Sequence, residues 1–110
     1  LLGIIIEELT GEDVFDVIHE RFLEPFRLDL TTPSNSRVLE NLSSGYLAAD
    51  NPFGLPAKTT STDGKLLWHP GFEWTGGGFV SNPKDLARWG WILFEGDAMP
   101  YPYLDALLNA

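Results

Sequence analysis

The sequence contains no cysteine, which excludes disulfide bonds and any metal site built from thiolates. The redox compartment stays open, because disulfide-free proteins occur on both sides of a membrane. Basic residues are also scarce: 7 Lys and Arg stand against 16 Asp and Glu, which gives a formal net charge of −9. These basic residues are scattered along the chain. The composition therefore argues against a nucleic-acid surface and against adsorption to an anionic membrane.

Long apolar runs are missing as well. The longest extends from Leu1 to Ile6, whereas a membrane-spanning helix needs about 20 apolar residues, and Glu7 and Glu8 follow it directly. The run also lacks the basic leader and the cleavage site of a signal peptide. We therefore predict no membrane span in this segment. Because neither a cap nor a turn precedes the run, we expect it to be the middle of an element in a longer protein.

The composition is typical of a folded globular chain. Its residues are 44% hydrophobic, 13% aromatic and 21% charged, and a length of 110 residues corresponds to one domain. No internal repeat or low-complexity tract interrupts the sequence. We expect a single, mainly α-helical segment over residues 1–110, with three or four helices, at most short strands and a long irregular stretch.

Two helices are predicted near the N-terminus. The first has apolar residues at helical spacing and ends at Gly11, although its first turn is apolar all round, as in a buried helix or a buried strand. The second begins near Glu12 or Asp13, whose acidic side chains favour a helix N-terminus, and is stopped by Pro25. Its apolar positions recur at steps of three and four residues and comprise Val14, Val17, Ile18 and Phe22.

The strongest helix signal lies at residues 83–95. Asn82 is placed as the N-cap, Pro83 occupies the first helical position, and Asp85 stands where a capping-box acid reaches back. Gly96 is the expected C-cap. One face should carry Leu86, Trp89 and Leu93.

The region from residue 30 to residue 72 has no clear periodicity. Ser, Thr, Asn, Pro and Gly punctuate it, and we predict an irregular, loop-rich insertion in which only residues 45–49 and 65–69 form short extended segments. Such long structureless stretches are uncommon in compact domains. We interpret it as a functional loop or as a segment that wraps over a surface supplied by the rest of a longer protein. A last helix or turn is expected at residues 103–108.

Metal and cofactor sites are not indicated. His19-Glu20 begins like the His-Glu-x-x-His motif of zinc proteases, but Leu23 occupies the second histidine position, so we interpret His19 as part of a solvated helix face. Adjacent acidic pairs splay apart on a helix. We interpret these pairs, Glu7/Glu8 and Glu12/Asp13, as solvated faces or as partners of a helix N-terminus.

His69, Ser81 and Asp85 could form a catalytic triad, because a triad is recognised by geometry and not by sequence order. We disfavour this reading, because a hydroxyl beside an N-cap ordinarily bonds to backbone groups, and His69 between Trp68 and Pro70 is more typical of a surface or packing residue.

The glycines at 76–78 are not a phosphate loop, since no Gly-Lys-Ser/Thr follows them. They allow a positive φ or a close approach of the backbone to another backbone or to a ligand. Trp74, just before them, is either a core residue or the wall of a binding cleft, and the residues alone leave both readings open.

Four blocks that together extend over almost the whole chain lie at residues 1–11, 23–28, 44–46 and 77–89. In this order they resemble the superfamily of serine β-lactamases and D-alanyl-D-alanine carboxypeptidases, in particular its class C-like and esterase-like members. The last block is similar to the family pattern Gly-Gly-x-x-Ser-x-x-x-Asp-Leu-Ala-Arg. The resemblance implies a helical-lobe segment of an α+β fold, in which a helical lobe packs on an antiparallel sheet.

The same resemblance implies a role in the substrate cleft. Residues just before the last block border the acyl pocket in class C-like enzymes, and the corresponding substrate-binding residues here are Trp74, Thr75, Gly76 and Gly77. Where class C enzymes carry a pocket tyrosine, this chain has Gly77, which implies a more open pocket and puts lactam specificity in doubt. The family works with Ser-x-x-Lys, Tyr-x-Asn and His/Lys-x-Gly motifs. We expect the segment to lack all three, with no catalytic residue of its own.

Our first hypothesis is therefore an internal segment of a serine hydrolase that acts on an amide, lactam or ester through an acyl-enzyme, with the rest of the parent chain as its partner. The second is a catalytically silent binding or structural module on the same scaffold. A third is an autonomous helical interaction domain. No cofactor is expected, and a periplasmic or other extracytoplasmic location is favoured by the resemblance alone.

Overall fold

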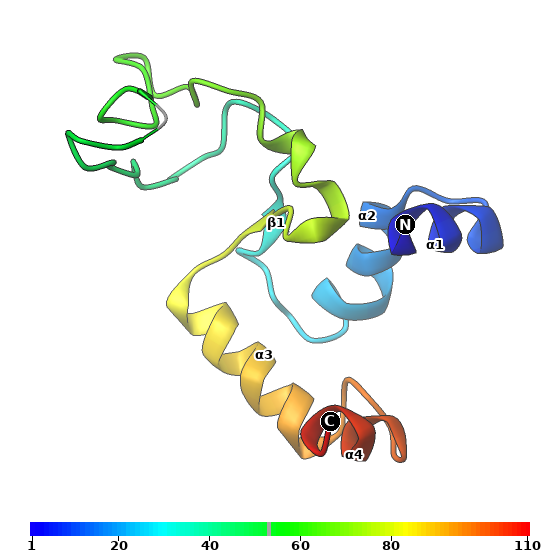
Figure 1. Ribbon diagram of the computed structural model, residues 1–110. Helices are drawn as coiled ribbons and strands as arrows, with labels where there is room; N and C mark the ends of the chain where they lie inside the picture. Colours follow the sequence, from blue (N-terminus) through cyan, green and yellow to red (C-terminus); the bar gives the residue numbers. More distant parts are fainter. Residues whose placement is uncertain (53) are drawn as a thin grey trace. The chain divides into compact units, whose positions relative to one another are not determined.

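The computed structural model describes residues 1–52 and 54–110, and it is mainly helical, as predicted (Figure 1). Phe53, inside the predicted irregular stretch, lies outside the described residues. The elements are the α-helices α1 (Leu2–Thr10), α2 (Val14–Ile18), α3 (Pro83–Glu95) and α4 (Tyr103–Leu108), the π-helix η1 (His19–Leu23), the 3-10 helices η2 (Pro70–Phe72) and η3 (Trp74–Gly76), and the strands β1 (Thr32–Pro33) and β2 (Phe79–Val80), which pair in a two-stranded sheet.

The chain divides into two compact units. The first unit combines Leu1–Thr32 with Ser81–Ala110 and contains all four α-helices. The second unit is Pro33–Val80, and most of it is loop. None of the helices in the described part of the chain is both long and apolar enough to cross a membrane.

Backbone groups at the junction of α1 and α2 are satisfied as the sequence predicted. Gly11 closes α1 with φ 74°, and its N–H donates to the carbonyl of Glu7. The Glu7 carboxylate in turn accepts the N–H of Val14 at 3.2 Å, and the Asp13 carboxylate accepts the N–H of Phe15 at 2.8 Å. One acid from each of the pairs Glu7/Glu8 and Glu12/Asp13 thus accepts a hydrogen bond at the N-terminus of α2. Unpaired N–H groups and the helix dipole favour negative charge there.

The apolar surface of α1 differs from the prediction. A buried element was expected, yet Leu2 is 74% exposed and Leu9 is 81% exposed, while the small Gly3 is buried. The helix forms because its spacing and its C-terminal glycine favour it, and it packs on α2 along one side. Its remaining apolar side chains face solvent in this unit.

Helix α3 begins and ends at the predicted residues. The Asn82 side chain accepts the N–H groups of Lys84 at 2.9 Å and Asp85 at 3.1 Å, and Gly96 ends the helix with φ 88°. The face predicted to carry Leu86, Trp89 and Leu93 is only partly covered, because Leu86 is 60% exposed. Ile92 is buried instead.

Aromatic contacts define the packed side of α3. The ring of Trp89 meets Phe22 edge to face at 5.9 Å and Phe26 at 6.4 Å between centroids. The Nε of Arg88 donates to the carbonyl of Phe26 at 2.6 Å. The helix therefore packs against the chain at and just after η1, and the core of this unit contains Val14, Val17, Leu23, Leu28, Ile92 and Leu104.

Asp85 does not close a capping box, which corrects the sequence prediction. Its Oδ2 accepts the N–H of Leu30 at 2.9 Å and the hydroxyl of Thr31 at 3.0 Å. The Thr31 hydroxyl has one hydrogen to donate, and it donates this hydrogen in the bond to the carboxylate. The Ser81 hydroxyl therefore donates to the Thr31 oxygen, at 2.7 Å. The carboxylate thus ties the N-terminal turn of α3 to a segment without regular structure, whose backbone needs a partner.

Burial acts to raise the pKa of Asp85, but the hydrogen bonds from Leu30 and Thr31 outweigh it and hold the pKa below its usual range. These donors stabilise the charged form. Folding therefore favours the ionised carboxylate.

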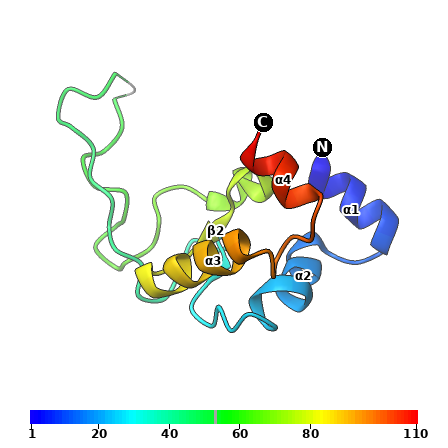
Figure 2. The same cartoon turned by 90° about the horizontal axis from the view of Figure 1, so that it is seen from below.

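The unit at residues 33–80 is held by loop contacts, and Figure 2 shows much of it without ribbons for helix or strand. The two predicted extended segments do not form strands. Each supplies one residue to an isolated bridge, Tyr46 to Lys58 and Leu66 to Thr60. Backbone hydrogen bonds such as that from Thr59 N–H to the Gly45 carbonyl at 3.0 Å join the loops, and a bond between the Ser44 and Thr60 hydroxyls at 2.6 Å adds to them.

We predict that Asp85→Ala destabilises the chain by about 2 kcal/mol at pH 7, because the part-buried hydrogen bonds from Leu30 and Thr31 lose their charged acceptor. Urea unfolding at fixed pH measures this loss. Asp97→Ala, at an exposed position, is the control and should change stability by less than about 0.5 kcal/mol. Equal effects of the two substitutions would contradict the assigned role.

The pH dependence gives a second readout. Because the folded pKa of Asp85 is lowered, its contribution is fully present above the unfolded pKa of about 3.9 and is lost as pH falls through the folded value. The difference in unfolding free energy between the parent and Asp85→Ala should therefore shrink on acidification below about pH 4. A difference that stays constant down to that range and beyond would argue against ionisation as its source.

Candidate functional site

The predicted substrate residues lie on a tight double turn of the 33–80 unit. It begins at His69, whose Nδ1 accepts the N–H of Gly71 at 3.1 Å and so caps η2, with Pro70 at the first helical position. A Cβ on Gly71 would lie 2.8 Å from that Nδ1, so the imidazole packs against a position that suits glycine. His69 therefore has a structural role in shaping this turn.

Trp74 begins η3 with an unusual backbone. Its φ is 35°, a left-handed value that bulky side chains rarely adopt. The carbonyl of Trp74 accepts the N–H of Gly78 at 2.9 Å, and the carbonyl of Glu73 accepts the N–H of Gly76 at 2.6 Å. These bonds fold residues 73–78 back on themselves and hold Trp74 in a strained conformation, a property often found at functional sites.

Different physical constraints apply to the three glycines at residues 76–78. Gly77 has φ 151° and ψ 17°, a conformation open to glycine. A Cβ on Gly78 would lie 2.2 Å from the carbonyl oxygen of Trp74, so any other residue there would force the turn apart. Gly76 has neither constraint, because its Cβ would come no closer than 3.9 Å to a described atom, in the Glu73 carboxylate.

Exposure separates the four predicted residues into two kinds. Trp74 is half-buried, whereas Thr75, Gly76 and Gly77 are exposed. The turn thus presents backbone and a small hydroxyl to solvent, with part of an indole ring beside them. Such a surface could contact a ligand through backbone polar groups and an apolar ring.

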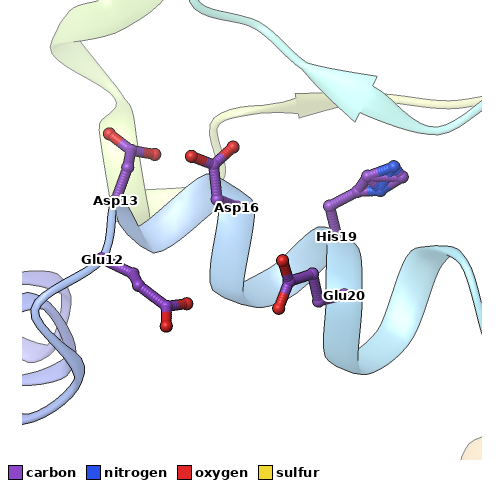
Figure 3. A pocket seen from close by; sticks show the side chains of 5 residues that line it. All are labelled: Glu12, Asp13, Asp16, His19 and Glu20. Carbon is purple, nitrogen blue, oxygen red and sulfur yellow. The ribbon is translucent and has the colours of Figure 1, made fainter.

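Two surface hollows of the first unit have other linings. One is lined by Glu12, Asp13, Asp16, His19 and Glu20, and Figure 3 shows the His19 ring pointing away from the carboxylates. No group of three or more His, Cys, Asp or Glu among the described residues is arranged to hold a metal ion. His19 is exposed, as predicted.

The second hollow is mostly apolar and lies where α1 meets α2 and η1. The residues that line this hollow are Ile6, Leu9, Thr10, Val17, Ile18, Arg21 and Phe22. Neither hollow includes the turn at residues 74–77.

The expectation that the segment lacks the Ser-x-x-Lys and His-x-Gly patterns is wrong, because both spacings occur in the sequence. Ser81 and Lys84 have the Ser-x-x-Lys spacing, and His69 to Gly71 spell His-x-Gly. Ser81, however, stands before the helix, with the extended Asn82 between it and α3, so the two side chains do not stack on successive turns of one helix. The Ser81 hydroxyl bonds to Thr31.

The His-x-Gly pattern also lacks its usual position on a β-strand. Residues 69–71 cap and begin a 3-10 helix, not a strand. Tyr-x-Asn is absent from the sequence.

The triad reading of His69, Ser81 and Asp85 gains no support. In a triad the carboxylate accepts a hydrogen bond from the Nδ1–H group of the histidine. Here Nδ1 of His69 accepts the N–H of Gly71, and the Asp85 carboxylate accepts from Leu30 and Thr31. Each group thus has another partner.

We predict that Gly78→Ala opens the turn, because its methyl group would collide with the carbonyl of Trp74. The expected loss is at least about 1 kcal/mol of local stability, measured by faster amide hydrogen exchange of residues 74–79. Gly76→Ala is the matched control, since its methyl group would come no closer than 3.9 Å to the Glu73 carboxylate, and should leave exchange unchanged or slower. Equal acceleration by both substitutions would refute the assigned difference.

Comparison with known proteins gives a match to a solved structure. No protein-family model matches the chain, and no curated protein matches it. Among solved structures, a D-stereospecific amidohydrolase from Streptomyces sp. matches with a TM-score of 0.70 and 22% sequence identity. The match covers 94% of this chain and 29% of the amidohydrolase chain. This chain therefore spans less than a third of the length of that protein.

The match concerns the fold. At 22% identity the match shows a shared β-lactamase-like fold, which is the fold that the resemblance of the four sequence blocks implies. The helical arrangement of this chain, with its small two-stranded sheet, is similar to one part of a β-lactamase-like fold.

Proposed function

We propose that this chain is a helical-lobe segment of a serine hydrolase, with the turn at residues 74–77 forming part of the wall of its substrate cleft. The structural match over 94% of the chain to part of an amidohydrolase carries the proposal. Residues 30–72 form a loop-rich insertion in this segment. The parent is of the β-lactamase, D-alanyl-D-alanine carboxypeptidase or esterase type.

The chemistry is acyl transfer. A serine hydroxyl of the parent chain attacks the carbonyl carbon of the substrate, and the bond to the amine or alcohol breaks as that group takes up the hydroxyl proton. Water then hydrolyses the acyl–serine ester, which frees the carboxylic acid and restores the serine. This segment is catalytically inert alone, because Ser81 is bonded to Thr31 outside the helix that carries Lys84. Its contribution is to shape the cleft.

The substrate class is a small amide, lactam or ester, and the amidohydrolase match favours an amide. The exposed backbone at Gly76 and Gly77 suits an extended acyl chain, because no side chain narrows the space above it. An open wall of this kind fits a wider range of acyl groups than one closed by a tyrosine, as in class C β-lactamases.

An active-site serine probe tests the hydrolase assignment. We expect a fluorophosphonate to label the longer polypeptide that contains these residues at one serine outside the segment, and a penicillin or a D-amino-acid amide to compete with it. A polypeptide that folds but resists labelling would instead be a catalytically silent module on the same scaffold.

We predict that Trp74→Ala in the active parent lowers kcat/KM by about tenfold, which corresponds to about 1.4 kcal/mol of transition-state binding, with little change in Tm. Steady-state kinetics and a thermal melt on the same samples measure both. Phe72→Ala, at a site that is 71% exposed two residues earlier, is the control and should change neither quantity. A large fall in Tm with unchanged kinetics would assign Trp74 to the core.

A further inference from the structure

We propose that the outer face of α3 is a docking surface for an apolar helix supplied by the remainder of a larger β-lactamase-like fold. The term outer face denotes the five residues Leu86, Ala87, Gly90, Trp91 and Phe94. Its three large side chains are exposed by 60%, 65% and 60% for Leu86, Trp91 and Phe94.

Helical spacing gathers these residues on one side. Leu86, Gly90 and Phe94 follow one another at steps of four, and Ala87 and Trp91 form a parallel row beside them. The opposite side of α3 is already used, since Asp85 and Ile92 are buried and Trp89 contacts the rings near η1. A helix that is apolar on both sides is typically covered on both.

Gly90 supports docking on the outer face independently of the exposed side chains. It lies in the interior of α3, where glycine weakens a helix relative to alanine. Nothing in the described part of the chain explains it, because a Cβ at this position would meet no atom within 4 Å and its φ is not positive. The missing side chain leaves a notch between Leu86 and Phe94. A notch of this kind lets the backbone of a second helix approach closely.

The chemistry of the face identifies its occupant. None of the five residues is charged, so the face offers no ion pair to a charged partner. A second copy of this chain would bring another net charge of −9 to the contact, which opposes association. The structural match leaves most of the amidohydrolase fold outside the aligned region. An apolar helix from that remainder is the occupant that meets all three observations.

The inference rests on the part of the proposed function that makes the chain a segment of a larger fold. It does not depend on catalysis. Serine labelling and docking therefore have separate readouts, and a polypeptide that is not labelled by the serine probe can still bury this face.

Single cysteines test the docking directly, because the sequence contains none of its own. Phe94→Cys should react with a soluble maleimide at least tenfold more slowly in the longer polypeptide than in the 110-residue chain. Lys84→Cys, on the charged side of the same helix, should react at similar rates in both. Equal rates for Phe94→Cys in the two polypeptides would overturn the proposal. Slow labelling in the 110-residue chain that speeds up on dilution would also overturn it, in favour of a second copy.

Gly90→Ala provides a test by stability. In the 110-residue chain the methyl group meets open space and favours the helix, so helicity by circular dichroism or Tm should rise, by about 3 °C for Tm. In the longer polypeptide the same methyl group fills the notch, and Tm should fall. A rise in both polypeptides would exclude a close contact at Gly90.

Discussion

The buried carboxylate of Asp85 is the interaction on which the helical unit depends. It lies at the N-terminal turn of α3, and it accepts hydrogen bonds from Leu30 and Thr31, 55 and 54 positions away in the sequence. These residues have no ladder partner of their own. A single side chain thus joins the two separate stretches of sequence that form this unit. The aromatic packing of Trp89 on Phe22 and Phe26, one turn further along α3, continues the same junction.

The residues that sequence reasoning placed correctly are those whose partners are close along the chain. The Asn82 cap, the glycines at 11 and 96 and the start of α2 all depend on hydrogen bonds within a few residues, so local patterns predict them. Asp85 was predicted as a local cap because Asp at that position is typical of a capping box. Its true partners are long-range, and a single sequence carries no signal for them.

Burial was harder to predict for a related reason. Helix α3 has apolar residues on two sides, and periodicity alone does not say which side meets the core of its own unit. The prediction grouped Leu86 with Trp89 and Leu93 on one face, whereas Ile92 is buried and Leu86 faces solvent. A short motif that the prediction overlooked shows that spacing alone does not make a catalytic site. Ser81 and Lys84 match Ser-x-x-Lys by spacing, but the extended Asn82 between them breaks the helical register that such a pair requires.

At the turn of residues 74–78, the proposed cleft wall and the fold depend on the same backbone constraint. The close approach at Gly78 and the positive φ of Trp74 belong to the same fold-back of the chain, so neither can relax without the other. That fold-back determines which groups face solvent: Thr75, Gly76 and Gly77 are exposed although the residues on both sides of them are more covered. A cleft wall needs this combination, because a rigid backbone keeps its polar groups in position while a ligand is bound. The strain at Trp74 is thus the cost of presenting three exposed residues on a fixed turn.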